Sequence, residues 1–392
     1  MQLSSKIAIA LSSVITLSLP SARAFEPLPL TRLVCREAKQ AAALIELDSQ
    51  LLSESLATED RESLLAAIDN SLAYLETPAS ITAYQNYSVS GVTHERVQRS
   101  LVRFRTLLLE SESAVDLQTA IAQDFTFYQS IGQDEAGTVA FTGYFEPTYA
   151  ASLTQTSGYQ YPLYKSPPNL ETWAKPNPTR LALEGADGLQ GDQGPLKGLE
   201  LVWLSSRLEA FLTQVQGSAR LQLTDGSTLS VGYDGRTDYP YTSMGRALID
   251  DGIIPEDKLS LPVLIEYFEQ NPEALNRYLP RNDRFIFFRE TDGAPATGSL
   301  GFPVTAGRSI ATDKSVMPPG ALALISLNLP QINSAGEIET RPTSRLVLDQ
   351  DTGGAIKGAG RVDIFIGTGT DAGKVAGLIN QTGTLYYLLL KE

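Results

Sequence analysis

Residues 347–369 read VLDQDTGGAIKGAGRVDIFIGTG, two apolar runs separated by a turn rich in glycine. In the second run, aliphatic residues at 362, 364 and 366 alternate with Asp363 and Phe365, and this period of two is typical of a β-strand. Successive side chains of a strand point to opposite faces, so Asp363 is expected to face away from the main apolar row. The stretch therefore predicts a strand that presents a carboxylate on one face.

Four carboxylates lie among these glycines: Asp349, Asp351, Asp363 and Asp371. Glycine lets a large ligand approach the backbone closely. An aspartate at a strand end in a cleft loses part of its hydration, which raises its pKa and suits it to general acid catalysis, for example on a glycosidic oxygen. Acidic residues in loops are more commonly solvated turn formers. Composition alone leaves both interpretations open.

Three better-known motifs are matched only in part by this sequence. An aspartic protease needs two Asp-Thr-Gly triplets that share a proton, and this chain holds one, at 351–353. The run Gly367-Thr-Gly369 has the third glycine of a dinucleotide fingerprint displaced by one position, and a P-loop needs Ser or Thr where Val375 follows Lys374. These departures argue against an aspartic protease and against nucleotide binding.

Outward from this stretch, the chain divides into a helical part and a β-rich part. Residues 25–136 are rich in Ala, Leu, Glu and Gln, with apolar residues at helical spacing, and predict helices. After about residue 136, short β-type runs alternate with turn residues and predict a barrel or sandwich, with short helices at 199–216 and 259–278. The expected strands are Thr138–Tyr144, Leu221–Val231, Arg284–Phe288, Ala321–Leu327, Leu346–Leu348, Val362–Ile366 and Leu385–Leu390.

Composition narrows the chemistry. The 392 residues include 31 Lys and Arg against 45 Asp and Glu, a net charge of −14, which argues against nucleic-acid binding. One cysteine excludes an internal disulfide and a Cys-rich zinc site. One histidine, His94, excludes a metal site with two or three histidines. We therefore expect no metal and no cofactor, and proton chemistry that rests on carboxylates.

The N-terminus predicts export. A short basic segment ending at Lys6 precedes an uncharged, mostly apolar run at 7–19, and Ala22-Arg23-Ala24 fits a small-x-small cleavage pattern. Residues 1–24 are thus expected to be a cleaved signal peptide. Cys35 lies beyond the cleavage site and lacks the apolar run that precedes a lipidated cysteine, so no lipid anchor is expected.

Nine short segments follow one another along the β-rich part in an order that resembles a known family. They are FTGYFEP (141–147), VGYDGR (231–236), YPY (239–241), MGR (244–246), FFR (287–289), GSLG (298–301), GRSI (307–310), QDTGGAIKG (350–358) and VD (362–363). Taken together, they resemble the lytic murein transglycosylase A family, and the resemblance covers roughly residues 137–392.

The resemblance implies a fold and a site. The fold would be a double-psi β-barrel formed by 137–152 plus 290–392, with a mostly β domain inserted at 153–289 and a groove between them. The family's catalytic aspartate maps to Asp363, which would protonate the leaving glycosidic oxygen and then accept the proton of the muramoyl C6 hydroxyl. Supporting roles are expected for Asp351 and Asp371. Groove contacts are expected from Thr142, Tyr144, Phe145, Gly353 and Gly354.

The family cuts the β-1,4 bond between N-acetylmuramic acid and N-acetylglucosamine in peptidoglycan and leaves a 1,6-anhydro end. The resemblance thus implies a periplasmic enzyme whose partner is the glycan strand. Residues 25–136 fall outside the resemblance and are a candidate contact region for a cell-wall or outer-membrane protein. Two alternatives remain open on sequence: a glycan-binding module without turnover, and a hydrolytic β-glucanase on the same barrel with a second carboxylate such as Asp351 or Asp371.

Overall fold

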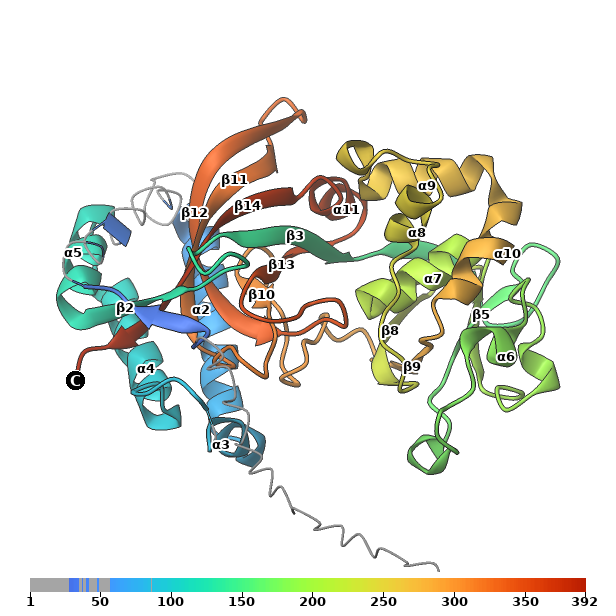
Figure 1. Cartoon of the computed structure of the whole chain (residues 1–392), viewed down its shortest axis with the longest axis horizontal. Coiled ribbons are helices and arrows are strands. Elements are labelled where there is room, and N and C mark those ends of the chain that lie inside the picture. The colour runs from blue at the N-terminus through green and yellow to red at the C-terminus, as the bar shows by residue number, and fades with distance from the viewer. Residues whose placement is uncertain (1–27, 35–36, 38–39, 42–47, 49–56, 86) are drawn as a thin grey trace, which may run out of the picture.

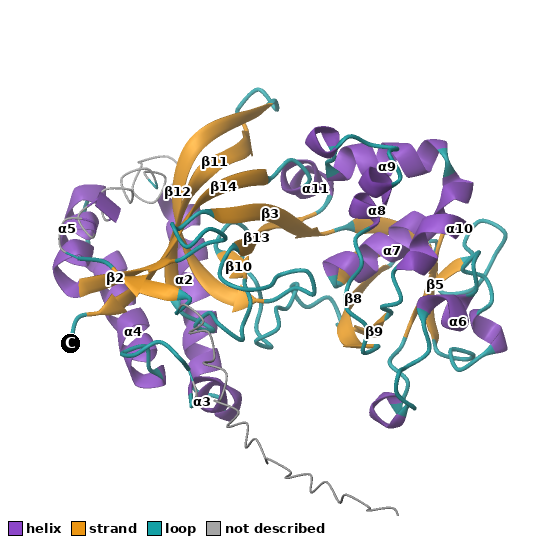
Figure 2. Cartoon of the chain, in the orientation of Figure 1, coloured by secondary structure: helices purple, strands orange, loops and turns teal. Residues whose placement is uncertain are grey.

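The computed structural model describes residues 28–392 except 35–36, 38–39, 42–47, 49–56 and 86. The expected signal peptide at 1–24 and Cys35 lie outside the described residues. The described chain forms a β-barrel flanked by helices, and beside it a second sheet with helices of its own (Figure 1). Strands dominate the barrel, whereas helices and strands mix in the second unit (Figure 2).

Six strands close the barrel. They follow one another in the order β14-β11-β12-β10-β13-β3, and β3 also pairs with β14, which completes the ring. Pairing is parallel for β10–β12 and β13–β3 and antiparallel for the other pairs of the ring. The barrel expected from the sequence is thus confirmed. Its strands are β3 (Val139–Glu146), β10 (Ser309–Ala311), β11 (Leu322–Ile332), β12 (Ile338–Asp351), β13 (Arg361–Thr368) and β14 (Asn380–Leu390).

The apolar pattern of each barrel strand follows what covers it. On β13, Val362 and Ile364 are at most 1% exposed, while Asp363 between them is partly accessible, as the alternation predicts. On β11 the whole run 322–325 is buried, because helices pack on the outer face of the barrel there. A strand covered on both faces reads as a continuous apolar run rather than an alternating one.

Four helices ahead of the barrel have bounds within the described residues, and two of them pack on its strands. Thr93 caps the N-terminus of the third helix: its hydroxyl accepts a hydrogen bond from the backbone amide of Arg96 at 3.2 Å. That helix buries Val97, Leu101 and Phe104 against the barrel. No helix in the described part of the chain is long and apolar enough to cross a membrane. The helices are α2 (Ala57–Leu75), α3 (Pro78–Tyr84), α4 (His94–Glu110) and α5 (Ala114–Asp124).

Two strands interrupt the region 25–136, which the sequence predicts to be helical. β2 (Phe125–Ser130) pairs with β14, and β1 (Leu30–Arg32) pairs with β2, so both extend the barrel sheet at its edge. Aromatic and β-branched residues fill β2, which reads FTFYQS, and they suit a sheet packed against helices. Helical composition in the surrounding segments masked this short run.

The second sheet has six strands in the order β5-β6-β4-β7-β8-β9. Residues 199–216, expected as one helix, instead form a strand and a helix separated by Ser205 and Ser206, and the Ser206 hydroxyl accepts the amide of Glu209 at 3.4 Å. The strands are β4 (Thr148–Ser152), β5 (Tyr161–Tyr164), β6 (Glu200–Leu204), β7 (Ser218–Leu223), β8 (Thr228–Arg236) and β9 (Ile286–Glu290).

Short helices surround this sheet, and one more lies on the barrel between β13 and β14. The expected helix at 259–278 is divided at Asn271-Pro272. The helices are α6 (Arg180–Glu184), α7 (Arg207–Gln216), α8 (Met244–Asp250), α9 (Leu261–Gln270), α10 (Leu275–Tyr278) and α11 (Thr370–Ala376). The 3-10 turns are η3 (Leu170–Thr172), η4 (Gly191–Gln193), η5 (Glu256–Lys258), η6 (Pro272–Ala274) and η7 (Leu279–Arg281).

A single residue, Pro147, separates β3 of the barrel from β4 of the second sheet. Figure 1 shows β3 running out of the barrel toward the second sheet. At the junction Glu146 is 1% exposed and accepts hydrogen bonds from the Thr368 hydroxyl at 2.7 Å and from Arg220 Nε at 2.9 Å. This buried carboxylate ties the barrel strand β13 to strand β7 of the second sheet.

Gly143 of β3 offers a test of the packing beside this junction. A Cβ at this position would lie 2.7 Å from the Cα of Ala376 and 2.8 Å from its carbonyl oxygen, so α11 would have to move away from β3. We expect Gly143→Ala to lower the free energy of unfolding by about 1–3 kcal/mol in urea titrations. Gly158→Ala is the matched control, because no heavy atom lies within 4 Å of the added Cβ. Equal stability of the two variants would contradict the close packing of α11 on β3.

Candidate active site

A groove of about 820 Å³ opens between the barrel and the second sheet. Side chains from both units line it, so it exists only when the two are held side by side. The barrel contributes, among others, Tyr144, Ser299, Asp351, Gly353, Gly354, Lys357, Arg361 and Asp363. The second unit contributes, among others, Arg180, Tyr233, Arg236, Tyr239, Tyr241, Arg284 and Arg289.

Asp363 lies on the barrel side of this groove, in the middle of β13. The parallel register places Thr142 of β3 directly beside it, and the Thr142 hydroxyl donates a hydrogen bond to Asp363 Oδ1. Arg361, two residues away on the same face of β13, approaches the same oxygen with Nε at 3.3 Å. The Asp363 side chain is 19% exposed, so it is anchored by one oxygen and still accessible.

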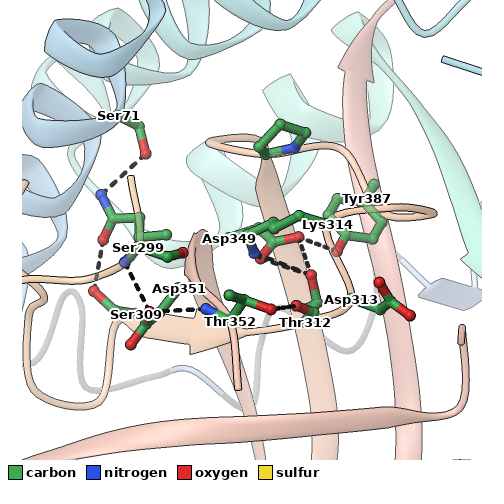
Figure 3. A network of polar contacts seen from close by, with 12 residues as sticks. Ser71, Ser299, Ser309, Thr312, Asp313, Lys314, Asp349, Asp351, Thr352 and Tyr387 are labelled. Atoms are coloured by element: carbon green, nitrogen blue, oxygen red, sulfur yellow. Dashed lines mark hydrogen bonds and ion pairs between the residues drawn. The ribbon is translucent and has the colours of Figure 1, made fainter. Parts of the chain in front are cut away.

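Asp351, at the end of β12, is held more completely. Its Oδ2 accepts the Tyr144 hydroxyl at 2.8 Å, and its Oδ1 accepts the backbone amides of Ser299 and Thr352, each at 2.8 Å. Figure 3 shows the two amides converging on this carboxylate. Burial raises the pKa of Asp351, and these hydrogen bonds offset part of that rise. With both oxygens occupied, Asp351 supports the groove wall.

A second buried carboxylate lies behind the site. Asp349, two residues earlier on β12, is fully buried and forms an ion pair with Lys314. It also accepts the Tyr387 hydroxyl at 2.6 Å and the Thr312 hydroxyl at 2.8 Å (Figure 3). Burial raises the pKa of Asp349, while Lys314 acts in the opposite direction. Because no part of its side chain reaches the groove, this residue stabilises the barrel and has no access to a ligand.

Strand parity separates the predicted groove residues on β3. Tyr144 lines the groove, with its ring 5.2 Å from that of Phe365, and Thr142 lies beside Asp363. Phe145 points to the opposite face, where its ring packs on Gly373 of α11, and it does not line the groove. The structure therefore brings Tyr144 to the groove, places Thr142 beside Asp363 but outside the groove lining, and directs Phe145 to the other face.

The remaining predicted residues divide in the same manner. Gly353 and Gly354 line the groove, and a Cβ at Gly354 would lie 1.9 Å from Arg284 Nη1, so only glycine admits this contact. Asp371 is 73% exposed on α11, pairs with Lys374 at 2.8 Å and lies outside the groove lining. The structure does not bring Asp371 to Asp363.

The groove wall from the second unit is what the sequence reasoning missed. Tyr233, Tyr239 and Tyr241 line it together with several arginines. All three tyrosines fall in segments that carried the family resemblance, and this was the available signal. Within the described residues, no three side chains of the His, Cys, Asp or Glu types gather closely enough to hold a metal ion.

A groove lined by tyrosines, arginines and glycines, with an accessible carboxylate anchored on a barrel strand, is typical of a carbohydrate-active protein. Profile comparisons give the family. Residues 140–289 match the MltA specific insert domain, and residues 308–389 match the 3D domain.

Individual relatives agree with these matches. The chain is 34% identical over 264 residues to the membrane-bound lytic murein transglycosylase A of Vibrio cholerae, covering 67% of this chain and 68% of that protein. This chain belongs to the lytic murein transglycosylase A family.

Solved structures share the fold. The membrane-bound lytic murein transglycosylase from Agrobacterium tumefaciens is similar with a TM-score of 0.68 and 25% identity, over 84% of this chain and 93% of that one. Escherichia coli MltA with bound chitohexaose is similar with a TM-score of 0.66 and 25% identity, over 96% of this chain and all of the other.

The raised pKa of Asp351 gives a prediction about pH. A carboxyl whose pKa is higher in the folded protein binds protons more tightly there than in the unfolded chain, where the value is about 3.9. The parent therefore loses stability as pH rises from about 3.9 through the folded pKa of Asp351. We expect Asp351→Asn to escape this loss, so that the difference in unfolding free energy shifts in favour of the variant across that window. Urea titrations between pH 3 and pH 8 check this, and a difference that is independent of pH would contradict it.

Proposed function

We propose that the protein cleaves the glycan strands of peptidoglycan between N-acetylmuramic acid and N-acetylglucosamine, with Asp363 as acid and then as base. Membership of the family makes it a peptidoglycan lytic transglycosylase. The observation that supports Asp363 as the catalytic group is its anchoring: Oδ1 is held by Thr142 and Arg361, and no described residue hydrogen-bonds to Oδ2. One oxygen is thereby oriented by the protein while the other is left for a substrate.

The reaction proceeds in two proton transfers. Protonated Asp363 gives its proton to the glycosidic oxygen as the bond between that oxygen and C1 of the muramoyl residue breaks. The muramoyl C6 hydroxyl oxygen then bonds to C1, and the Asp363 carboxylate takes the hydroxyl proton. The products are a 1,6-anhydro end and a free 4-hydroxyl, no water is consumed, and the carboxyl returns protonated.

The other groove carboxylates favour this mechanism over hydrolysis. An inverting hydrolase needs a second free carboxylate to activate water. Among the described residues that line the groove, Glu146 is bonded to Arg220 and Thr368, Asp238 pairs with Lys175 at 2.8 Å, and both oxygens of Asp351 are occupied. Of the two groove carboxylates on strands β12 and β13, Asp363 keeps an unoccupied oxygen and Asp351 does not. An accessible, oriented carboxylate also speaks against a module that only binds glycan.

The setting of the enzyme extends the proposal. Escherichia coli MltA has been seen with bound chitohexaose, which supports a glycan strand as the occupant of this groove. The pattern of residues 1–24 supports export to the periplasm through a cleaved signal peptide without a lipid anchor. The sequence places the boundaries of the insert at 153 and 289, but β4 (Thr148–Ser152) and β9 (Ile286–Glu290) pair within the second sheet. We therefore assign the barrel to 137–147 plus 291–392 and the groove-forming insert to 148–290. The helices at 57–124 remain a candidate surface for a cell-wall or outer-membrane protein.

The first experiment digests purified peptidoglycan with residues 25–392 and with the Asp363→Asn variant. We expect mass spectrometry to show anhydro-muramoyl ends from the parent and an initial rate lower by about 10²–10⁴-fold from the variant, because the amide cannot supply the proton. Asp257→Asn is the matched control, since this carboxylate is 75% exposed and outside the groove.

Each outcome separates the candidate functions. Reducing ends in place of anhydro ends would identify a hydrolase. Binding without products from the parent would identify a glycan-binding module. Anhydro ends made equally fast by the parent and by Asp363→Asn would remove Asp363 from the catalytic role.

A further inference from the structure

Four basic side chains line the groove and form no ion pair with a described residue: Arg236, Arg284, Arg289 and Lys357, here called the groove cations. Among them, Lys357 helps to lower the pKa of Asp313 through its charge. None of them forms an ion pair or a side-chain hydrogen bond with any described residue. The net charge of the chain is −14, so carboxylates are abundant elsewhere on the protein. Unpaired cations that gather in one groove of an acidic protein require an explanation.

Arg284 gives the sharpest observation. It is half-buried, its Nε is fully buried without a hydrogen-bond partner, and its Nη1 lies against the backbone of Gly354. Arg236 lines the same groove, and burial together with the positive charge of Arg236 lowers the pKa of Arg284. A guanidinium stays charged in proteins, so Arg284 carries a charge where burial removes water from Nε and a second cation lines the same groove.

Arg180, another arginine that lines the groove, has protein partners for its guanidinium group. Arg180 donates to Gln214 Oε1 and to the carbonyl of Arg284, each at 2.6 Å, and approaches Glu184 at 3.4 Å. Its guanidinium also lies 5.2 Å from the ring of Phe211 and 5.0 Å from that of Phe285. Arg180 is satisfied by the protein, whereas Arg236 and Arg284 are not.

The groove carboxylates cannot supply the missing anions, because Glu146, Asp238 and Asp351 are engaged elsewhere. Guanidinium groups bind carboxylates through paired hydrogen bonds of defined geometry. Local departures from satisfied electrostatics are expected where a ligand completes the site. We infer that the groove cations, with Arg236 and Arg284 at their centre, bind carboxylates carried by the glycan strand.

This inference rests on the proposed function and makes it more specific. In peptidoglycan, carboxylates come from the lactyl ether of N-acetylmuramic acid where no peptide is attached, and from stem peptides where one is. Chitohexaose carries neither. The groove thus prefers a glycan with acidic substituents over a neutral chitooligosaccharide of equal length, and the preference weakens as salt screens the charges.

Calorimetric binding with four hexasaccharides tests this in the Asp363→Asn background, where turnover is expected to be slower by about 10²–10⁴-fold. The ligands are chitohexaose, an alternating GlcNAc–MurNAc hexamer with free lactyl carboxylates, the same hexamer with those carboxylates amidated, and the hexamer bearing stem peptides. We expect an acidic hexamer to bind about tenfold or more tightly than chitohexaose at low salt. Tight binding of the free lactyl form identifies the lactyl group as the source, and tight binding of the peptide-bearing form alone identifies the stem peptide.

Variants assign the preference to the residues. Arg236→Gln and Arg284→Gln are each expected to weaken binding of the acidic hexamer by about tenfold and that of chitohexaose by less than about twofold. Arg236 is exposed, so its variant keeps the test valid if Arg284→Gln fails to fold. Arg246→Gln removes an equal charge from an arginine that pairs with Glu256 outside the groove, and should change neither affinity.

Equal affinity of the Asp363→Asn protein for all four ligands would overturn the inference. It would also be overturned if both arginine variants lost as much affinity for chitohexaose as for the acidic hexamer. Binding is measured without catalysis, so these results are independent of product formation. A preference for acidic glycan together with no anhydro ends from the active chain would refute the proposed reaction and leave the carboxylate site standing.

Discussion

One continuous extended segment, β3 followed by β4, joins the barrel to the second sheet, and the site depends on it. β3 closes the barrel by pairing with β13 and β14, and after Pro147 the same run continues as β4 in the second sheet. Its alternate residues hold the site together: Thr142 bonds to Asp363, Tyr144 to Asp351, and Glu146 to Arg220 and Thr368. A shift of β3 by one residue would turn all three away at once.

The barrel treats its acidic residues in three different ways. Asp349 is buried and neutralised by Lys314, Asp351 is bound through both oxygens, and Asp363 is bound through one. These differences arise from position along neighbouring strands, because the closed sheet determines which backbone amides and hydroxyls each carboxylate meets. Three aspartates with the same side chain therefore differ in burial, in hydrogen bonding and in access to a ligand.

Local pattern explains what the sequence could predict. The alternation around Asp363 placed its carboxylate opposite the apolar row, and β13 has this arrangement. The same alternation, applied to β3, would have put Phe145 on the face opposite Thr142 and Tyr144, so that error was avoidable. The pair Ser205-Ser206 could likewise have indicated that a helix begins there after a strand, because serine is a favoured N-cap residue.

Other features depend on contacts between distant segments. Arg284 meets Gly354 across the groove, and no periodicity in either segment indicates that they approach. Asp371 follows a glycine turn as Asp351 precedes one, yet it lies in the first turn of α11, on the side of that helix that faces solvent. The positions of these residues are set by closure of the barrel and by where the insert lies. Resemblance to a family indicates these positions only for residues that lie within or beside the matching motifs.

The order of strands in the barrel has a consequence for biosynthesis. β3 emerges early, but its neighbours β13 and β14 come from the last part of the chain, and β2 also waits for β14. Thr142 and Asp363 are 221 residues apart in sequence and meet only when the final strands arrive. A chain that still lacks β13 and β14 therefore has Thr142 without Asp363 and no assembled site. The enzyme becomes competent to cut only after its C-terminal strands have paired with β3.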